Sequence, residues 1–405
     1  MKWMCIFSLI FLSTSGCVWI EPNDEIPDED VFSQPLESLG EIEHEEFLRG
    51  RALFRRAFDP TTLGPIFNAA SCSQCHARDG RAHPSTPGLL YKVDDAVYGA
   101  QFQTSAISGV KPEGEVRRSY DTALGDYRDG STFSLRVPSY ELANLNYGPI
   151  QNPSIGPRLA MQIAGLGLLE AIPEADILAN EDSNDADGDG ISGRAHWVIE
   201  EATSILRVGR FGWKAAHPTL EQQNAAALVN DMGLTNPVFA EGPCTSLQVE
   251  CVAAQDAMLE VSQTELDLLT TYVAGLAPPV SKIGPEHRIG EQLFEQATCS
   301  ACHVPELAPG VAAYTDLLLH DMGLGLADQI QEGDAKPTEW RTPPLWGIGA
   351  LPAVNGHQML LHDGRAQNVE EAILWHGGEA ERSVEIFKSM SLEERTALID
   401  FVNAI

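Results

Sequence analysis

FNAASCSQCH, residues 67–76 of the chain, ends in a Cys-x-x-Cys-His pattern formed by Cys72, Cys75 and His76. Two thiols at this spacing can add across the two vinyl groups of one haem, and the histidine that follows can then bind the iron. The same Cys-x-x-Cys spacing also occurs in zinc sites and in redox-active dithiols. A single copy therefore indicates a c-type haem but leaves these two alternatives open.

A second copy of the pattern lies in the C-terminal part of the chain. Residues 294–303 read FEQATCSACH and repeat the first stretch as F-x-x-A-[ST]-C-S-x-C-H, with Cys299, Cys302 and His303 in the corresponding positions. Two chance matches over ten positions are improbable. The sequence thus predicts two covalently bound c-type haems, with His76 and His303 as the iron ligands that follow the cysteines.

Two further segments repeat as well. Residues 262–276, SQTELDLLTTYVAGL, and residues 391–405, SLEERTALIDFVNAI, share the pattern S-x-x-E-x-x-x-L-x-x-[YF]-V-x-x-[LI]. Each opens with a capping box and then places apolar residues at helical spacing. We expect two equivalent helices, each of which closes one copy of a duplicated domain.

The repeats predict a mainly α fold of two fused cytochrome c-like haem domains, residues 47–276 and 286–405. The proline-containing segment 277–285 would link them. Residues 80–158 are rich in Gly, Pro, Ser and Tyr, and we expect them to enlarge the first domain with long loops and short strands wrapped around the first haem.

The N-terminus has the features of an export signal. Residues 1–16 combine one lysine, a short apolar run and small residues before Cys17, which is typical of a signal peptide whose cleavage leaves a lipid-modified cysteine; simple cleavage nearby is the alternative. Residues 17–46 are acidic and are expected to form a solvated tether. The expected location is therefore extracytoplasmic, in the periplasm, with membrane contact only through a lipid anchor.

The charge narrows the choice of partners. The formal net charge is −32, from 58 acidic and 26 basic residues, which argues against nucleic acid as a partner. A small, basic electron-donor protein fits better, although acidity also keeps an exported protein soluble. A small-molecule donor remains an alternative.

Two cysteines are left once haem attachment, the signal and the lipid anchor are accounted for. Cys244 and Cys251 are expected to form a disulfide in an oxidising compartment. Two reduced bystanders and a redox-active pair are the alternatives.

An acidic turn resembles part of a calcium loop. Residues 182–192 read DSNDADGDGIS and place Asp185, Asp187 and Asp189 at alternate positions ahead of a glycine. Calcium prefers several oxygens from one tight turn. The twelfth position is His196 where an EF-hand has glutamate, so the turn is not a standard EF-hand, and a solvated acidic turn is the alternative to a calcium site.

Three long blocks carry a family resemblance. They are residues 165–178, GLGLLEAIPEADIL, residues 210–233, RFGWKAAHPTLEQQNAAALVNDMG, and residues 360–380, LLHDGRAQNVEEAILWHGGEA. With the two haem motifs, they resemble the bacterial di-haem oxidoreductases often labelled thiol oxidoreductases, which are relatives of the di-haem cytochrome c peroxidases. The resemblance covers nearly the whole chain from about residue 50.

The resemblance implies a di-haem oxidoreductase. The second haem would take electrons from a small donor, and the first haem would reduce a small oxidant such as hydrogen peroxide. Two other functions stay open: an electron-transfer module in which both irons are six-coordinate, and a thiol oxidoreductase in which Cys244 and Cys251 cycle.

The resemblance also implies axial ligands. His376 follows the His-Asp-Gly turn at the position of the distal ligand of the second haem, so the second iron would be held by His303 and His376. Met322 is the rival ligand, and core packing is the alternative for both. The relatives commonly have methionine at this position, and replacement by histidine lowers the reduction potential.

For the first haem, the resemblance implies a catalytic pocket. Gln223 and Asp231 correspond to the glutamine and glutamate of the peroxidase pocket, and Trp213 would lie between the haems. Asp231 could instead cap a helix, and Trp213 could simply pack. Met232 and His83 are candidate sixth ligands of the first iron.

Overall fold

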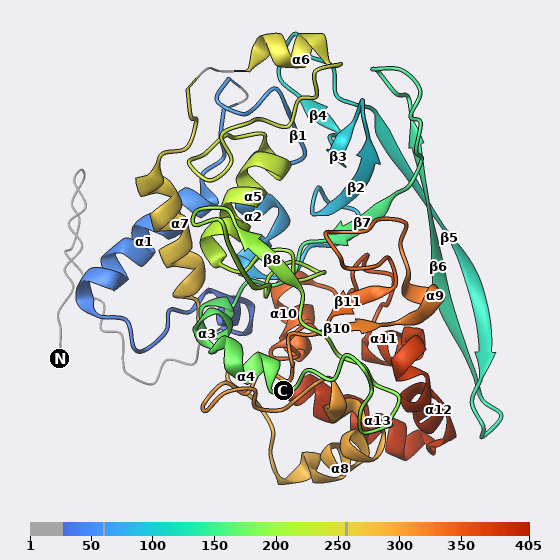
Figure 1. The fold of residues 1–405 in the computed structure, drawn as a ribbon. Helices are drawn as coiled ribbons and strands as arrows, with labels where there is room; N and C mark the ends of the chain where they lie inside the picture. Colours follow the sequence, from blue (N-terminus) through green and yellow to red (C-terminus); the bar gives the residue numbers. More distant parts are fainter. Residues whose placement is uncertain (1–26, 60, 256–257) are drawn as a thin grey trace, which may run out of the picture.

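The computed structural model describes residues 27–59, 61–255 and 258–405 (Figure 1). The predicted signal peptide, Cys17 and the first part of the predicted tether lie outside these residues. Within the described part, no helix has the length and apolar character needed to span a membrane.

Two long helices build the N-terminal half around the first motif. Helix α1 (Glu41–Arg55) lies against α7 (Gln263–Ala274), and the ring of Tyr272 packs 4.9 Å from Phe47 and 5.2 Å from Phe54. A side chain at Gly50 would collide with the backbone of α7, so glycine allows this close crossing. The first motif forms the short helix α2 (Cys72–Cys75) beside this pair.

The C-terminal half repeats this arrangement. Helix α8 (Arg288–Gln296) lies against α13 (Leu392–Ala404), with the rings of Phe294 and Phe401 5.4 Å apart. Here too a glycine, Gly290, allows the crossing, because a side chain would collide with the backbone of α13. The capping boxes predicted for α7 and α13 are confirmed, with Ser262 and Ser391 as their N-cap residues.

Eight further α-helices complete the described part of the two halves. In the N-terminal half they are α3 (Leu166–Ala171), α4 (Glu174–Leu178), α5 (Leu220–Met232) and α6 (Val249–Ala254). In the C-terminal half they are α9 (Gly323–Leu326), α10 (Leu351–Asn355), α11 (Val369–Trp375) and α12 (Glu381–Ser389).

The described strands form five small antiparallel sheets. The three-stranded sheet has β2 (Leu89–Asp95) between β3 (Gly99–Phe102) and β7 (Gly156–Leu159). The two-stranded sheets pair β1 (Ile66–Phe67) with β4 (Ser105–Ala106), β5 (Glu115–Asp126) with β6 (Thr132–Ala143), β8 (Trp197–Glu200) with β9 (Ile205–Val208), and β10 (Leu319–Asp321) with β11 (Glu339–Arg341).

The hairpin of β5 and β6 differs from the expectation of short strands around the first haem. Its strands are 12 residues each, and it runs along the molecule to the C-terminal half (Figure 1). There Tyr127 donates a hydrogen bond to Glu370, and Arg395 forms an ion pair with Asp129 at 3.0 Å. The insertion therefore connects the N-terminal half of the chain to the C-terminal half through side-chain contacts.

The segment predicted as a solvated tether is partly folded in the residues that the structure describes. Asp28–Ser33 form a 3-10 helix, in which Phe32 is completely buried and Ser33 donates a hydrogen bond to Asp79. The aromatic side chain anchors this acidic segment, which composition alone did not reveal.

The two halves share one hydrophobic core. Side chains as far apart in sequence as Phe32, Tyr272 and Ile405 belong to the same buried cluster. Two backbone hydrogen bonds hold the predicted linker 277–285: the N–H of Ala277 donates to Gln34, and the N–H of Lys282 donates to Ala404. The structure is thus a mixed fold of helices and small sheets, in which two helix pairs are repeated around a common core.

Candidate functional site

Both Cys-x-x-Cys-His motifs face a single cavity of about 410 Å³. Its lining includes all six motif residues: Cys72, Cys75, His76, Cys299, Cys302 and His303. It also includes the predicted residues Trp213, Gln223, Asp231, Met232, Met322 and His376. The fold therefore brings together, in one internal space, most of the residues that the sequence singled out.

The two motif histidines are oriented in the same way. Nδ1 of His76 lies 2.7 Å from the carbonyl oxygen of Met161, and Nδ1 of His303 lies 3.0 Å from that of Tyr314. A carbonyl can only accept, so each Nδ1 carries the proton and each Nε2 keeps its lone pair. Burial lowers the pKa of both rings, that of His303 to about 4. Both are thus neutral imidazoles with the tautomer that binds iron through Nε2.

His376, in the C-terminal half, is anchored through Nδ1 in the same way as the two motif histidines. It is the C-cap residue of α11, and its Nδ1 lies 2.6 Å from the carbonyl oxygen of Ala372. Its charge would lower the pKa of His303, so the two rings are close enough to interact. Burial lowers the pKa of His376 itself, which favours the neutral, ligating form. Met322 lines the same cavity, but His376 alone of the two has the anchored geometry of a ligand.

The cysteine pairs do not have the surroundings of zinc sites. A metal site needs several His, Cys, Asp or Glu side chains whose ligand atoms lie close together. Among the described residues, one group of at least three such side chains has its ligand atoms within 4.8 Å of one another, and it contains only aspartates. A structural zinc site needs four ligands, so neither pair has the partners for it. Burial raises the pKa of Cys72 and of Cys299 to about 12, which disfavours the thiolate that a redox dithiol requires.

Three buried arginines fit the carboxylate-bearing edges of haem. Arg81, Arg210 and Arg341 line the cavity, and among the described residues their hydrogen bonds go to backbone carbonyls, an amide and a sulfur but to no carboxylate. Nε of Arg81 has no hydrogen-bond partner in the described part of the chain. Burial lowers the pKa of Arg81 to about 9 and that of Arg341 to about 10.

Buried cations without anionic partners are costly, and haem propionates would supply the missing charge. Arg158, which also lines the cavity, shows the contrast: its guanidinium is already paired with Asp328 and Glu332. The residues present therefore fit haem both at the histidines and at the arginines.

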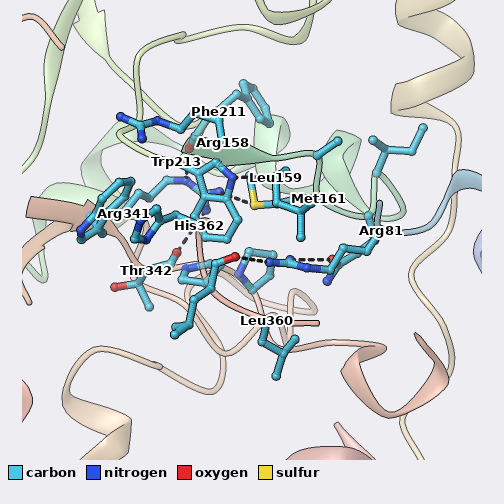
Figure 2. Close-up of a pocket in the computed structure, with 18 of the residues that line it drawn as sticks. Arg81, Arg158, Leu159, Met161, Phe211, Trp213, Arg341, Thr342, Leu360 and His362 are labelled. Atoms are coloured by element: carbon cyan, nitrogen blue, oxygen red, sulfur yellow. Dashed lines mark hydrogen bonds between the residues drawn. The ribbon is translucent and has the colours of Figure 1, made fainter. Parts of the chain in front are cut away.

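An aromatic cluster lies among these arginines (Figure 2). Trp213 donates from Nε1 to the carbonyl oxygen of Leu159 at 2.8 Å, and its ring centre is 6.4 Å from that of His362. His362 in turn stacks on Trp340 at 3.9 Å and 11°. Trp213 lines the shared cavity, and its location between the haems stays a prediction. Trp340 was not identified from the sequence, because no local pattern marks it.

Of the predicted catalytic residues, Asp231 lies beside the first motif. Asp231 lies near the end of α5, and its charge raises the pKa of both Cys72 and Cys75. The carboxylate whose charge raises the pKa of His76 is a different one, Asp79. Nε2 of Gln101 donates to Asp231 at 2.8 Å. Burial raises the pKa of Asp231 to about 6. Asp231 is therefore a carboxylate that can exchange protons near neutral pH.

Other polar groups complete this end of the cavity. The amide oxygen of Gln223 is buried and has no hydrogen-bond partner among the described residues. Gln101 and Lys92 also line the cavity and were missed by the sequence reasoning. They are opposite one another on β2 and β3, a pairing that the sequence does not show.

The candidate sixth ligands of the first iron differ in position. Met232 is buried and lines the cavity. His83 does not line it; its Nδ1 lies 2.6 Å from Oγ of Ser85, and its ring is 5.0 Å from that of His357. The structure thus separates His83 from the site, because the turn after the first motif directs it elsewhere.

The acidic turn brings together a slightly different set of aspartates from the predicted one. Asp182, Asp185 and Asp187 have carboxylate oxygens within 4.8 Å of one another. Asp189 is not part of this group and accepts the backbone N–H of Ile191 instead. Calcium binding stays a prediction.

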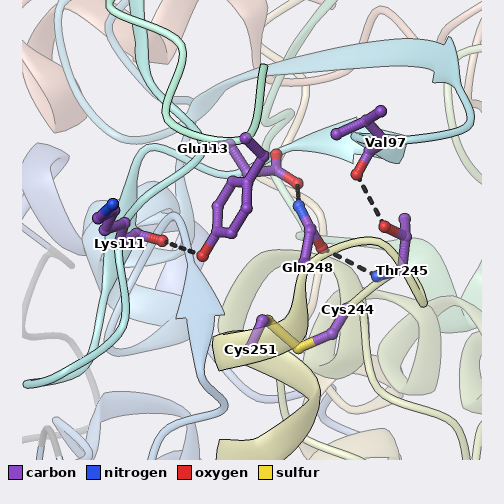
Figure 3. Close-up of a disulfide and its surroundings, with 8 residues drawn as sticks. Val97, Lys111, Glu113, Cys244, Thr245, Gln248 and Cys251 are labelled. Atoms are coloured by element: carbon purple, nitrogen blue, oxygen red, sulfur yellow. Dashed lines mark hydrogen bonds between the residues drawn. A yellow bond between two sulfur atoms is a disulfide. The ribbon is translucent and has the colours of Figure 1, made fainter.

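The predicted disulfide between Cys244 and Cys251 is confirmed (Figure 3). Gln248, which lies between the two cysteines in sequence, donates a hydrogen bond to Glu113, and burial raises the pKa of Glu113 to about 8. Neither cysteine lines the haem-site cavity. The disulfide therefore closes a short local loop at the start of α6, and the hydrogen bond from Gln248 to Glu113 joins this loop to the body of the fold.

The chain matches a family model described as "Di-haem oxidoreductase, putative peroxidase" over residues 27–97 and 99–405. The chain belongs to this di-haem oxidoreductase family. Two Cys-x-x-Cys-His motifs that share one cavity are what a di-haem protein requires. Membership of this family identifies the protein as an oxidoreductase with haem cofactors. The resemblance inferred from the sequence blocks is thereby confirmed.

Two other comparisons add little. A hydrazine synthase structure from Kuenenia stuttgartiensis, pressurised with xenon, aligns with a TM-score of 0.39 and 13% identity, over 98% of this chain and 99% of that chain. This likeness is too low to carry an argument. No curated protein sequence matches the chain.

Proposed function

We propose that this chain is a peroxidase-like oxidoreductase with two covalently attached c-type haems. Cys72 and Cys75 would hold the first haem, and Cys299 and Cys302 the second. When bound, the haems supply a route for electrons from a small donor at the second motif to a small oxidant, such as hydrogen peroxide, at the first.

The observation that carries the proposal is the asymmetry of the shared cavity. At the second motif, His376 has the same carbonyl-anchored tautomer as His303, as expected for a closed iron with two histidine ligands. At the first motif, Asp231 is hydrogen-bonded to Gln101, and Gln223 and Met232 also line the cavity. Of these four, only Met232 is a residue type that commonly binds haem iron, and we propose that it leaves the first iron open. Chemistry is therefore expected at the first motif and electron entry at the second.

The residues at the first motif suit proton transfer to peroxide. Reduction of hydrogen peroxide to two waters breaks the O–O bond and consumes two electrons and two protons. Asp231, with its pKa near 6, can take the proton from one peroxide oxygen and return it to the other. The unpartnered amide of Gln223 can orient the peroxide by a hydrogen bond.

Trp213 is proposed to assist electron transfer between the two motifs. Its indole is fixed by the hydrogen bond to Leu159 and lies beside His362. The guanidinium of Arg81 lies 5.2 Å from the indole ring centre. A nearby cation disfavours a positive charge on the ring. Trp213 is thus proposed to couple the two sites without itself being stably oxidised.

Carbon monoxide binding and peroxide reactivity together test the proposal. We expect fully reduced protein to bind one carbon monoxide per chain, and half-reduced protein to react with peroxide in stopped-flow spectra. Low-temperature EPR should show a bis-histidine signal for one iron only. Protein that binds no carbon monoxide and does not react with peroxide would instead be a closed electron-transfer module.

The donor and the location are proposed from the sequence. The net charge of −32 favours a small cationic electron-donor protein. The signal and Cys17 favour an exported, lipid-anchored protein. Fatty-acid labelling, with Cys17→Ser as the control, tests the anchor.

A further inference from the structure

Two histidines that line the cavity, His217 and His362, have a buried ring nitrogen without a hydrogen-bond partner among the described residues. The ring of His362 is stacked on Trp340, whereas no ring contact holds His217 among the described residues.

Nδ1 of His76, His303 and His376 is held by a carbonyl oxygen, and both ring nitrogens of His320 are held by carboxylates. His217 also lines the cavity, yet neither of its ring nitrogens has a hydrogen-bond partner among the described residues, and Nδ1 is buried. A buried imidazole nitrogen without a partner is unfavourable unless something absent from the protein chain occupies the space beside it.

The backbone holds His217 firmly in this place. Its carbonyl oxygen accepts hydrogen bonds from the N–H groups of Arg210 and Phe211 at 2.9 and 3.0 Å, and its own N–H donates to Phe211. Helix α5 begins three residues later, with Thr219 as its N-cap. His217 is thus fixed at one end of the helix that carries Gln223 and Asp231 further along.

His217 lies close to Gln223, because a Cβ atom placed on Gly212 would be 3.6 Å from Oε1 of Gln223 and 3.9 Å from the backbone nitrogen of Ala216, the residue before His217. The charge of Lys92 lowers the pKa of His217 and also that of Asp231, so Lys92 lies within reach of both. Lys92 pairs across the sheet with Gln101, whose side chain binds Asp231. His217 therefore lies near Gln223, the residue that is proposed to orient the peroxide.

His217 is expected to be uncharged. Burial is the main cause that lowers its pKa, to about 4, with further lowering by Lys92 and His196. Glu332 acts in the opposite direction, but its carboxylate is paired with Arg158 at 2.6 Å. A neutral imidazole offers one N–H donor and one acceptor nitrogen.

We propose that His217 is a catalytic residue that hydrogen-bonds the oxidant at the first motif and donates to the oxygen that leaves when the O–O bond breaks. This inference rests on the proposed function. The two electrons come from the donor, and the two protons that form water come from solvent. Asp231 moves the peroxide proton, while His217 stabilises the leaving oxygen through its N–H and is unchanged at the end.

The experiment compares three variants of the haem-loaded protein. His217→Leu removes the hydrogen bond, His217→Gln keeps an N–H donor, and His83→Gln is a matched control outside the cavity. Haem content, measured as the pyridine haemochrome, confirms that each variant is folded and loaded.

Two readouts are expected to change together. The infrared C–O stretch of carbon monoxide on the reduced protein should shift in His217→Leu, and its sensitivity to D2O should disappear. The rate of peroxide reaction should fall about 100-fold, the order expected for the loss of one preorganised donor. His217→Gln should recover part of both effects, and His83→Gln should match the wild type.

The inference is overturned if His217→Leu leaves both the C–O stretch and the peroxide rate within about twofold of the wild type. It is also overturned if the first iron is low-spin in the wild type and becomes high-spin in His217→Leu, since His217 would then be an iron ligand. A wild-type protein that binds no carbon monoxide would overturn both this inference and the proposed function. By contrast, normal wild-type reactivity with an inert His217 would overturn this inference alone.

Discussion

The rate of peroxide reduction is expected to rise with pH as Asp231 ionises. Burial raises the pKa of this carboxyl to about 6, while the hydrogen bond from Gln101 and the charge of Lys92 lower it. Only the carboxylate form can accept a proton from peroxide. With a pKa near 6, about 9% of Asp231 is ionised at pH 5 and about 91% at pH 7, so the rate should increase about tenfold over this range.

Single-turnover stopped-flow measurements on half-reduced protein, from pH 4.5 to 8, test this expectation. Asp231→Asn should slow the reaction by about 10²- to 10⁴-fold and remove the inflection. Gln101→Leu removes the hydrogen bond that favours the carboxylate, so the inflection should move to higher pH. Glu113→Gln is the matched control, because Glu113 is another buried carboxyl with a raised pKa that does not line the cavity.

Two results would refute the reasoning about Asp231. One is a wild-type rate that does not change between pH 5 and pH 7. The other is an Asp231→Asn variant that keeps the wild-type rate and inflection, which would assign the proton transfer to a different group.

Two further predictions concern the second haem and the disulfide. His376→Met should raise the reduction potential of one haem and replace its bis-histidine EPR signal, whereas Met322→Leu should leave that signal unchanged; the reverse outcome would make Met322 the ligand. Replacing Cys244 and Cys251 together by serine should lower the free energy of unfolding by about 2 to 3 kcal/mol, measured by urea denaturation, because the bond closes a loop with a sequence separation of 7. The same double variant should keep the wild-type peroxide rate, and loss of that rate would favour thiol chemistry instead.

Much of the site was accessible from sequence because it is encoded locally. The motif residues Cys72 and His76 are four positions apart, and Ser262 caps α7 through a glutamate three positions later. Such short spacings fix geometry through the backbone itself. The blocks that resemble the di-haem oxidoreductases then located Gln223, Asp231 and His376, which line the cavity that both motifs share.

The sequence was less informative where long-range packing decides the outcome. Composition favoured a solvated tether before residue 47, but one aromatic side chain, Phe32, is buried in the common core. Similarly, the loop-rich insertion was expected around the first haem, whereas its hairpin reaches Glu370 and Arg395 in the other half. A few side chains determine where such a segment docks, and their partners lie hundreds of residues away.

The sequence by itself therefore determined the two attachment motifs, the paired closing helices and the family, since each depends on residues that are neighbours along the chain. Only the tertiary structure decided that both motifs open into one cavity. It also decided that, among the residues it describes, Arg81 and Arg341 have no hydrogen-bonded carboxylate and His217 has no partner for its ring nitrogens. These properties depend on which groups burial leaves without a partner, and that is settled only when distant segments pack together.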